Sequence, residues 1–268
     1  MFTVVIFLHV VVLMIIMSVD TRPLVIGSYN CRGFNTRKSS YVADLFSECD
    51  VLLLQEHWLS DSQLPMLGDI KKGIMYNGIS GFDHTEVLSG RPYGGCAILW
   101  HSELNLSVLP ISVDSRRMCA ISLSSDNWKL IVMNVYMPYE DSDRNIDDYM
   151  YLLSLIEDVI TSNADSHFIV GGDFNVDFQR NGLHTALLRK FCDNAGLVAF
   201  VKHTNSVVDY TYHFCIDRFN ILDHFLLSAF LFYSTVDKVC VNHCVDNVSD
   251  HDPIFIKLNL NFLSLIHI

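Results

Sequence analysis

The stretch Phe168–Asp177, Phe-Ile-Val-Gly-Gly-Asp-Phe-Asn-Val-Asp, most constrains what this chain can fold into. Its apolar start predicts a short buried strand. Gly171 and Gly172 then predict a turn or a close backbone approach, because glycine has no Cβ. Asp173 and Asn175 stand at alternate positions and can face the same side. These residues alone are also typical of an ordinary turn, so the argument depends on whether the pattern recurs.

The pattern does recur, because several apolar runs carry a polar residue at one end. It follows the run at Asn30, Glu56, Tyr136 and Asp173, and precedes it at Asp223 and His251. In a mixed sheet, the ends of strands running one way lie beside the starts of strands running the other way. All six side chains are therefore predicted to line one edge, although any one alone would be an ordinary surface or core-edge residue.

The predicted elements favour an α+β fold, because strands outnumber helices and several strands are consecutive. We expect one domain over residues 24–260, a tail over 261–268, and a loop-rich region from Ser60 to Tyr93. The predicted strands are Leu24–Tyr29, Val51–Leu54, Cys96–Trp100, Met118–Leu123, Leu130–Val135, His167–Gly172, Phe225–Ser228 and Ile254–Leu258. The predicted helices are Thr36–Cys49, an amphipathic helix marked by Ile146, Tyr149, Leu153, Ile156 and Ile160, and His184–Asn194.

Residues 1–20 form a separate N-terminal segment that is almost continuously apolar from Phe2 to Val19. Its length lies between a signal-peptide core and a short membrane span. No Lys or Arg precedes it and no small-x-small cleavage site follows it. The segment is a candidate signal anchor, which would make a membrane a partner of residues 1–19; an atypical or artefactual start is the alternative.

Charge and cysteine content limit the function classes. The formal charge of −12, from 18 basic and 30 acidic residues, argues against tight non-specific binding of nucleic acid. It leaves room for a nuclease with an acidic metal centre. The eight cysteines include no CxxC pair, and the cluster Cys240, His243 and Cys244 lacks a fourth zinc ligand. Buried free thiols are therefore predicted, with a disulfide framework as the weaker alternative.

An ordered set of motifs resembles the endonuclease/exonuclease/phosphatase superfamily over residues 24–260. The motifs are Tyr29-Asn30, Leu54-Gln55-Glu56, Asn134-Val135-Tyr136-Met137-Pro138, Gly171-Gly172-Asp173-Phe174-Asn175, Leu222-Asp223-His224-Phe225-Leu226-Leu227-Ser228 and Ser249-Asp250-His251-Asp252-Pro253. The resemblance implies a four-layered α/β sandwich, in which two mixed sheets pack face to face between helices. Within the superfamily, the sequence is most similar to apurinic endonucleases and to the endonuclease domains of non-LTR (LINE-type) retrotransposons.

Phosphodiester cleavage needs charge neutralisation and an activated water, and Mg²⁺ prefers oxygen ligands. Glu56 is the first choice as metal ligand, with Asn30 and Asp250 nearby; Mn²⁺ is an alternative ion. The resemblance implies that Asp173 orients or deprotonates the water. It further implies phosphate contacts from Asn175, Tyr136 and His251, with Asp223 orienting His251.

Two other residues are weaker candidates for phosphate contacts. Thr211 loosely matches a Ser/Thr of the retrotransposon members. Arg32 stands where the apurinic endonucleases carry an acidic residue, which puts a second metal-associated carboxylate in doubt. The departure favours the retrotransposon branch, and Arg32 is either a phosphate contact or a surface residue.

The leading hypothesis is a monomeric, Mg²⁺-dependent DNA endonuclease that nicks DNA as the retrotransposon domains do, by in-line attack of a water activated by Asp173. The net charge predicts weak affinity for DNA. A phosphomonoesterase or lipid phosphodiesterase of the same superfamily is the rival, and an inactive remnant that binds a partner is the third reading. The location would be nuclear or cytoplasmic for a retrotransposon endonuclease, and membrane-anchored or secreted if residues 1–19 are a genuine signal.

Overall fold

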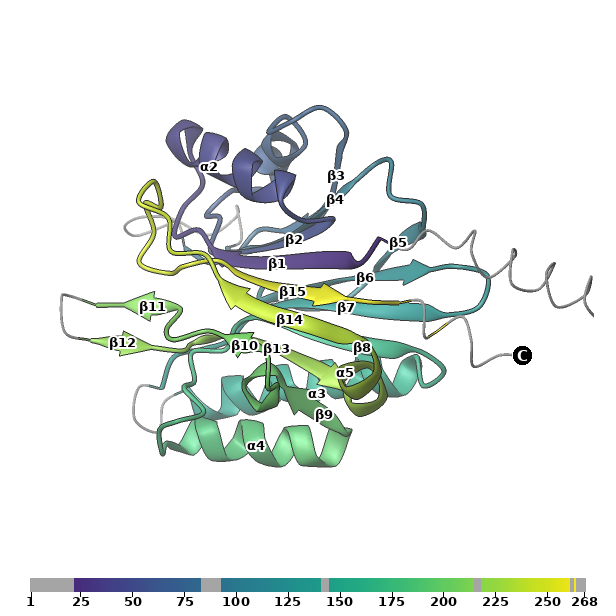
Figure 1. The fold of residues 1–268 in the computed structure, drawn as a ribbon. Coiled ribbons are helices and arrows are strands. Elements are labelled where there is room, and N and C mark those ends of the chain that lie inside the picture. Colours follow the sequence, from purple (N-terminus) through teal and green to yellow (C-terminus); the bar gives the residue numbers. More distant parts are fainter. Residues whose placement is uncertain (1–21, 83–92, 141–144, 215–217, 261–262, 264–268) are drawn as a thin grey trace, which may run out of the picture.

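The computed structural model describes residues 22–82, 93–140, 145–214, 218–260 and 263. Two mixed sheets pack face to face in the middle of the molecule, and helices cover their outer faces (Figure 1). This is the four-layered α/β sandwich that the sequence predicts.

The first sheet has seven strands in the order β10-β14-β15-β1-β2-β4-β3. β1 runs parallel to β2, whereas β15 pairs with β1 in the antiparallel direction. The apolar runs that predicted the central strands are buried. The strands are β1 (Leu24–Asn30), β2 (Val51–Gln55), β3 (Ile74–Ile79), β4 (Cys96–His101), β10 (Ser206–Val207), β14 (Val236–Val241) and β15 (Ile254–Leu258).

The second sheet has six strands in the order β5-β6-β7-β8-β13-β9. β7 and β8 are parallel, and β13 is antiparallel to β8. Its strands are β5 (Ser107–Ile111), β6 (Met118–Ser124), β7 (Lys129–Tyr136), β8 (His167–Asp173), β9 (Leu197–Ala199) and β13 (Asp223–Ser228). A hairpin of β11 (Tyr212–His213) and β12 (Phe219–Asn220) projects from the left-hand edge in Figure 1.

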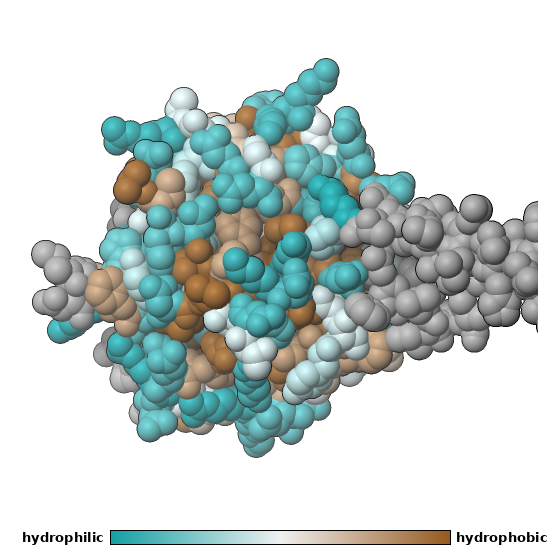
Figure 2. Space-filling view, in the orientation of Figure 1, coloured by the Kyte–Doolittle hydropathy of each residue, from teal (hydrophilic) through white to brown (hydrophobic). Residues whose placement is uncertain are grey.

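Apolar clusters lie between the sheets and on both outer faces. α2 (Thr36–Ser47) packs on the first sheet, and α3 (Ile146–Ser162) and α4 (Leu183–Ala195) pack on the second (Figure 1). Shorter elements are η1 (Asp61–Leu67), η2 (Phe200–Lys202) and α5 (Ala229–Thr235). Figure 2 shows hydrophilic side chains around the outline of this face and hydrophobic ones gathered toward its middle, where β14 lies in Figure 1.

Two polar side chains join the sheets inside the core. Gln55 Nε2 of β2 donates to Asn134 Oδ1 of β7 at 2.7 Å, and both residues are fully buried. Asn134 Nδ2 donates in turn to the backbone oxygens of Leu54 and Ala97, both at 2.8 Å. A buried polar pair costs stability unless it is hydrogen-bonded. These bonds therefore fix how the two sheets are aligned near the ends of β2 and β7.

The two glycines before Asp173 are required for different reasons. A Cβ at Gly171 would lie 2.5 Å from Leu53 Cδ1, so this glycine lets the sheets approach. Gly172 has φ +139° and a Cβ there would lie 2.0 Å from the Val135 oxygen. No L-residue with a side chain fits that backbone.

The predicted strands and helices are confirmed, with ends shifted by a few residues. Gly196 ends α4 in the left-handed conformation that suits glycine. The region from Ser60 to Tyr93 holds more regular structure than predicted, namely η1 and β3. β3 was missed because it is an edge strand with mostly half-buried residues and Asn77 and Gly78 inside it. The elements α5, η2, β5, β9, β10, β14 and the β11–β12 hairpin were also missed.

The predicted thiols are confirmed: the seven cysteines of the described chain are free, and five of them are buried. No helix among the described residues is long and apolar enough to cross a membrane. The candidate anchor over residues 1–19 lies outside the described residues. So does nearly all of the predicted tail over 261–268.

Candidate active site

The six predicted side chains meet at one edge of the sandwich, which we call the site edge. β1, β2, β7 and β8 end there, and β13 and β15 begin there. Asp173 is the register partner of both Tyr136 and Asp223. Asn30 pairs with Gln55, which directly precedes Glu56. The strand directions alone thus bring these residues to one place, as the sequence pattern predicted.

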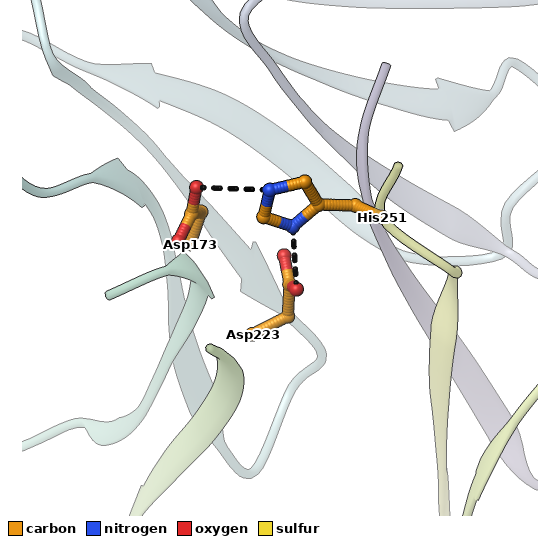
Figure 3. A group of neighbouring side chains, drawn as sticks. All are labelled: Asp173, Asp223 and His251. Atoms are coloured by element: carbon orange, nitrogen blue, oxygen red, sulfur yellow. Dashed lines mark hydrogen bonds and ion pairs between the residues drawn. The ribbon is translucent and has the colours of Figure 1, made fainter. Parts of the chain in front are cut away.

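His251 lies between two carboxylates (Figure 3). Its Nδ1 is 2.8 Å from Asp223 Oδ2, and its Nε2 is 3.8 Å from Asp173 Oδ2. All three residues are at most 5% exposed. Tyr212 forms a β-bridge with His251 and packs its ring 4.8 Å from the imidazole. The imidazole is therefore held in one orientation by a carboxylate, a backbone bridge and an aromatic ring.

Burial and charge act in opposite directions on His251 and Asp173. Burial disfavours the charged imidazolium, but the Asp223 and Asp173 carboxylates outweigh it and raise the pKa of His251 to about 9. Burial also raises the pKa of Asp173, to about 7, against the lowering effect of His251. His251 is thus cationic near neutral pH, while Asp173 is poised to exchange a proton there.

Asn30 connects the two sheets at the site. Its Nδ2 donates to Asp173 Oδ2 at 2.9 Å and to Glu56 Oε1 at 3.1 Å. Asn30 is fully buried on the first sheet, and Asp173 lies on the second. Ser249 Oγ donates to the Asn30 backbone oxygen at 2.8 Å, which fixes the loop before β15 against β1.

Glu56 has only neutral groups as its recorded hydrogen-bond partners among the described residues. Asn30 donates to Oε1 and Trp58 Nε1 to Oε2, both at 3.1 Å. Tyr136 lies next to Glu56; burial first, and then the Glu56 and Asp173 charges, raise the pKa of Tyr136 well above its usual value. The phenol therefore stays protonated and can donate to an anion. Arg117 lies over the Tyr136 ring, with Cζ 4.9 Å from the centroid.

Four non-glycine residues of the described chain have a left-handed backbone, and all belong to loops at the site edge. They are Arg32, Glu56, Trp58 and Asn175, with φ between +44° and +60°. Such conformations cost about 1–3 kcal/mol each and concentrate at functional sites. Asn175 tolerates this region best. Its backbone N–H donates to Asp173 Oδ1 at 2.9 Å, and its Nδ2 to the Met137 oxygen at 2.9 Å.

The residues around Glu56 fit a divalent cation. Glu56 supplies hard oxygen ligands, and its recorded donors carry no positive charge to balance the carboxylate. Asp173, Asp223 and His251 also lie close enough together to ligate an ion. His251, however, is held as an imidazolium by its two carboxylates, and in that state it has no lone pair to offer. Glu56 and Asn30 are therefore the better metal ligands.

The other three predicted residues have different contacts. Asp250, predicted as a metal ligand, forms an ion pair with Arg32, whose side chain is 45% exposed. Thr211, predicted to contact phosphate, is fully buried, and its hydroxyl accepts from the N–H groups of Leu222 (2.9 Å) and Asp223 (3.0 Å). Thr211 thus positions Asp223. The phosphate contacts of Thr211 and Arg32 stay predictions.

Sequence reasoning missed Asn247 as a functional residue. Asn247 Oδ1 accepts from the Tyr29 hydroxyl, and its Nδ2 donates to the His251 backbone oxygen and to Asp252 Oδ1. Its amide therefore braces the loop that carries His251. Asn247 lies outside the motifs that carry the resemblance, so no sequence signal indicates this role. Trp58 and Arg117 were missed as well, since neither belongs to a motif.

The buried His251–Asp223 pair, the Asn30–Glu56 pair and the neighbouring Tyr136 and Asn175 side chains fit a hydrolase that acts on phosphate esters. The sequence profile of the endonuclease/exonuclease/phosphatase family matches residues 27–251. The chain belongs to this family, a superfamily of nucleases and phosphatases. A search of curated proteins found no match.

Solved structures share the fold at low sequence identity. The endonuclease domain of TRAS1, a telomere-specific non-LTR retrotransposon, superposes with a TM-score of 0.66 at 14% identity and covers 89% of this chain and 99% of that one. The AP endonuclease LMAP from Leishmania major gives 0.69 at 16% identity, covering 90% and 89%. The 3′ phosphatase NExo from Neisseria, bound to a product DNA hairpin, gives 0.62 at 19% identity, covering 88% and 99%.

Proposed function

We propose that this protein is a divalent-metal-dependent phosphodiesterase that nicks DNA, with Mg²⁺ or Mn²⁺ as the ion. The observation that carries the proposal is the placement of His251 between Asp223 and Asp173, beside the Asn30–Glu56 pair. This arrangement puts a proton acceptor, a fixed cation and a set of metal ligands at one edge. These are the groups that hydrolysis of a phosphodiester requires.

Asp173 is proposed to take the proton of the attacking water. Its two oxygens accept from Asn30 Nδ2 and from the Asn175 backbone N–H. These bonds fix the orientation of the carboxylate, and the raised pKa of Asp173 makes it a stronger base than an exposed Asp. A water beside Asp173 would attack the phosphorus from the side opposite the leaving oxygen.

His251, Tyr136 and Asn175 are proposed to stabilise the phosphate. The imidazolium of His251 supplies a positive charge that Asp223 orients. The Tyr136 hydroxyl supplies a neutral donor, and the Asn175 amide lies beside Asp173. Donors that are already fixed cost no reorganisation when charge develops on the phosphate oxygens. Glu56 and Asn30 would hold the metal ion, which when bound neutralises phosphate charge and stabilises the leaving oxygen.

DNA is the proposed substrate because the similar structures include an endonuclease domain, an AP endonuclease and a 3′ phosphatase bound to DNA. The charge of −12 predicts that the affinity is weak and falls with salt. We propose that the protein acts as a monomer. As such a nuclease, it would work in the nucleus or cytoplasm.

The test is nicking of supercoiled plasmid by the full chain with Mg²⁺, compared with EDTA and with His251→Ala. We expect metal-dependent nicks that the variant loses. The same protein is assayed for release of 3′-phosphate from DNA, of phosphate from inositol phosphates, and of choline phosphate from sphingomyelin. Turnover of one of these with no nicking would replace the proposal with the phosphatase or lipid phosphodiesterase reading. A folded protein inactive on all of them would favour a binding remnant.

A further inference from the structure

The loop after β1 holds Arg32 in a fixed place at the site edge. Arg32 has a left-handed backbone with φ +44°. Its N–H donates to Asn30 Oδ1 at 3.1 Å, and its backbone oxygen accepts from Lys38 Nζ at 2.7 Å. Lys38 is itself buried, and its Nζ also donates to the Cys31 oxygen. An unfavourable backbone conformation that the surroundings hold in place points to a role for the side chain it presents.

That side chain binds Asp250. Arg32 Nη1 pairs with Asp250 Oδ2, which joins the loop after β1 to the loop before β15. The Asp250 side chain is 17% exposed, and its other oxygen, Oδ1, is buried with no hydrogen-bond partner in the described chain. The Asp250 backbone oxygen accepts from the His213 N–H at 3.0 Å, so the loop is held on both sides. A carboxylate in this position needs a cation, and Arg32 supplies it.

The charges at the site edge can be counted. The carboxylates of Glu56, Asp223 and Asp250 contribute three negative charges, and Asp173 contributes a fourth when it is ionised; His251 and Arg32 contribute two positive charges. The difference is −3 + 2 = −1 or −4 + 2 = −2, and one divalent cation is enough to balance it. A second divalent cation would leave an excess positive charge and would have to compete with a guanidinium for Asp250.

We propose that Arg32 is the second cation of this active site: it neutralises Asp250, and the site binds a single divalent metal ion at Glu56 and Asn30. This inference rests on the proposed metal-dependent function, and it revises the predicted role of Asp250 from metal ligand to partner of Arg32. A guanidinium has five N–H donors. The bond to one Asp250 oxygen does not use all of them. The Arg32 side chain is 45% exposed, so the same group can also bind a phosphate oxygen.

The test counts bound Mn²⁺ on the full chain by electron paramagnetic resonance and calorimetry, without substrate. We expect one Mn²⁺ per chain for the wild type and for Arg32→Lys, which keeps the charge. Arg32→Asp frees Asp250 and adds a carboxylate, so two Mn²⁺ are expected; Asp also tolerates the left-handed backbone. The matched control is Arg22→Ala, which breaks an Arg–Asp pair of the same kind with Asp50 away from the site.

A second variant keeps the proposal testable if Arg32→Asp does not fold. Arg32→Met with Asp250→Asn removes both charges, and we expect it to keep one Mn²⁺ with affinity close to the wild type. If Asp250 were itself a ligand, its loss would weaken binding by at least the about 10–100-fold that loss of an outer-shell partner costs, which would overturn the proposal. The proposal is also overturned if the wild-type chain binds two Mn²⁺ ions or none, or if a folded Arg32→Asp variant binds only one. The nuclease function and this inference can fail separately. If the wild type does not nick DNA but binds one Mn²⁺, and Arg32→Asp binds two, the nuclease function is refuted and this inference stands.

Discussion

The two halves of the site edge differ in how completely their polar groups are enclosed. The His251 half, with Asp223 and Asp173, is at most 5% exposed, and its charges pair with one another. The Glu56 half is only partly buried, has left-handed backbone at Glu56 and Trp58, and receives hydrogen bonds from the neutral donors Asn30 and Trp58. Asn30 bonds to both halves.

This difference separates two tasks. A buried, paired histidine keeps its charge and orientation before substrate arrives, which is what transition-state stabilisation requires. A partly open carboxylate bonded by neutral donors can exchange those contacts for a metal ion. The comparison predicts that changes in the His251 half act on the chemical step, whereas changes in the Glu56 half act on metal affinity.

Asp173→Asn tests the largest expected effect. The amide keeps the shape but cannot accept the proton of a water, so single-turnover nicking at saturating Mg²⁺ should fall about 10²–10⁴-fold. Asp165→Asn, an exposed change just before β8, is the matched control and should leave the rate unchanged. A full rate in Asp173→Asn would refute the assigned role.

Glu56→Gln should weaken the metal site instead. We expect the Mg²⁺ concentration for half-maximal nicking to rise by at least the about 10–100-fold that loss of an outer-shell partner costs, with much of the rate restored at high Mg²⁺. The measurement is a Mg²⁺ titration of nicking beside the wild type. A loss that no Mg²⁺ concentration restores would mean that Glu56 acts on the chemical step, and the division between the two halves would fail.

The pH profile sharpens the comparison. Activity should fall below about pH 7, as Asp173 gains a proton, and above about pH 9, as His251 loses one. Asp223→Asn removes a charge that favours the imidazolium, so the pKa of His251 should fall. The alkaline limb should then move to lower pH by about one unit or more. An unmoved alkaline limb would show that it reports another group.

Thr211→Val tests the smallest effect, on the support of Asp223. Valine has the shape of threonine but leaves the buried N–H groups of Leu222 and Asp223 without an acceptor. The free energy of unfolding should fall by about 1–3 kcal/mol, measured by urea denaturation. Thr211→Ser keeps the hydroxyl and should lose less. Equal losses would show that the methyl group, and not the hydroxyl, matters.

The sequence by itself determined which segments form the central strands and which polar residues stand at their ends. Apolar runs must be buried, so those that end at Asn30, Glu56, Tyr136 and Asp173 become the central strands. It could not find β3, an edge strand, or β14, which lies between β15 and the two-residue β10; most residues of both are half-buried or exposed, and neither is a continuous apolar run. Such strands are defined by their partners rather than by their own composition.

Apart from the His251–Asp223 pair, which the resemblance implied, only the tertiary structure decided which polar groups bind one another. Arg32 and Asp250 are 218 residues apart, and nothing in either motif indicates that they pair. Asn247 and Thr211 act through hydrogen bonds from loops whose positions depend on the whole sandwich. Hydrogen bonds need partners within about 3 Å and the right direction. Such geometry exists only after the two sheets have packed, so the sequence could name the chemistry of the site but not its supports.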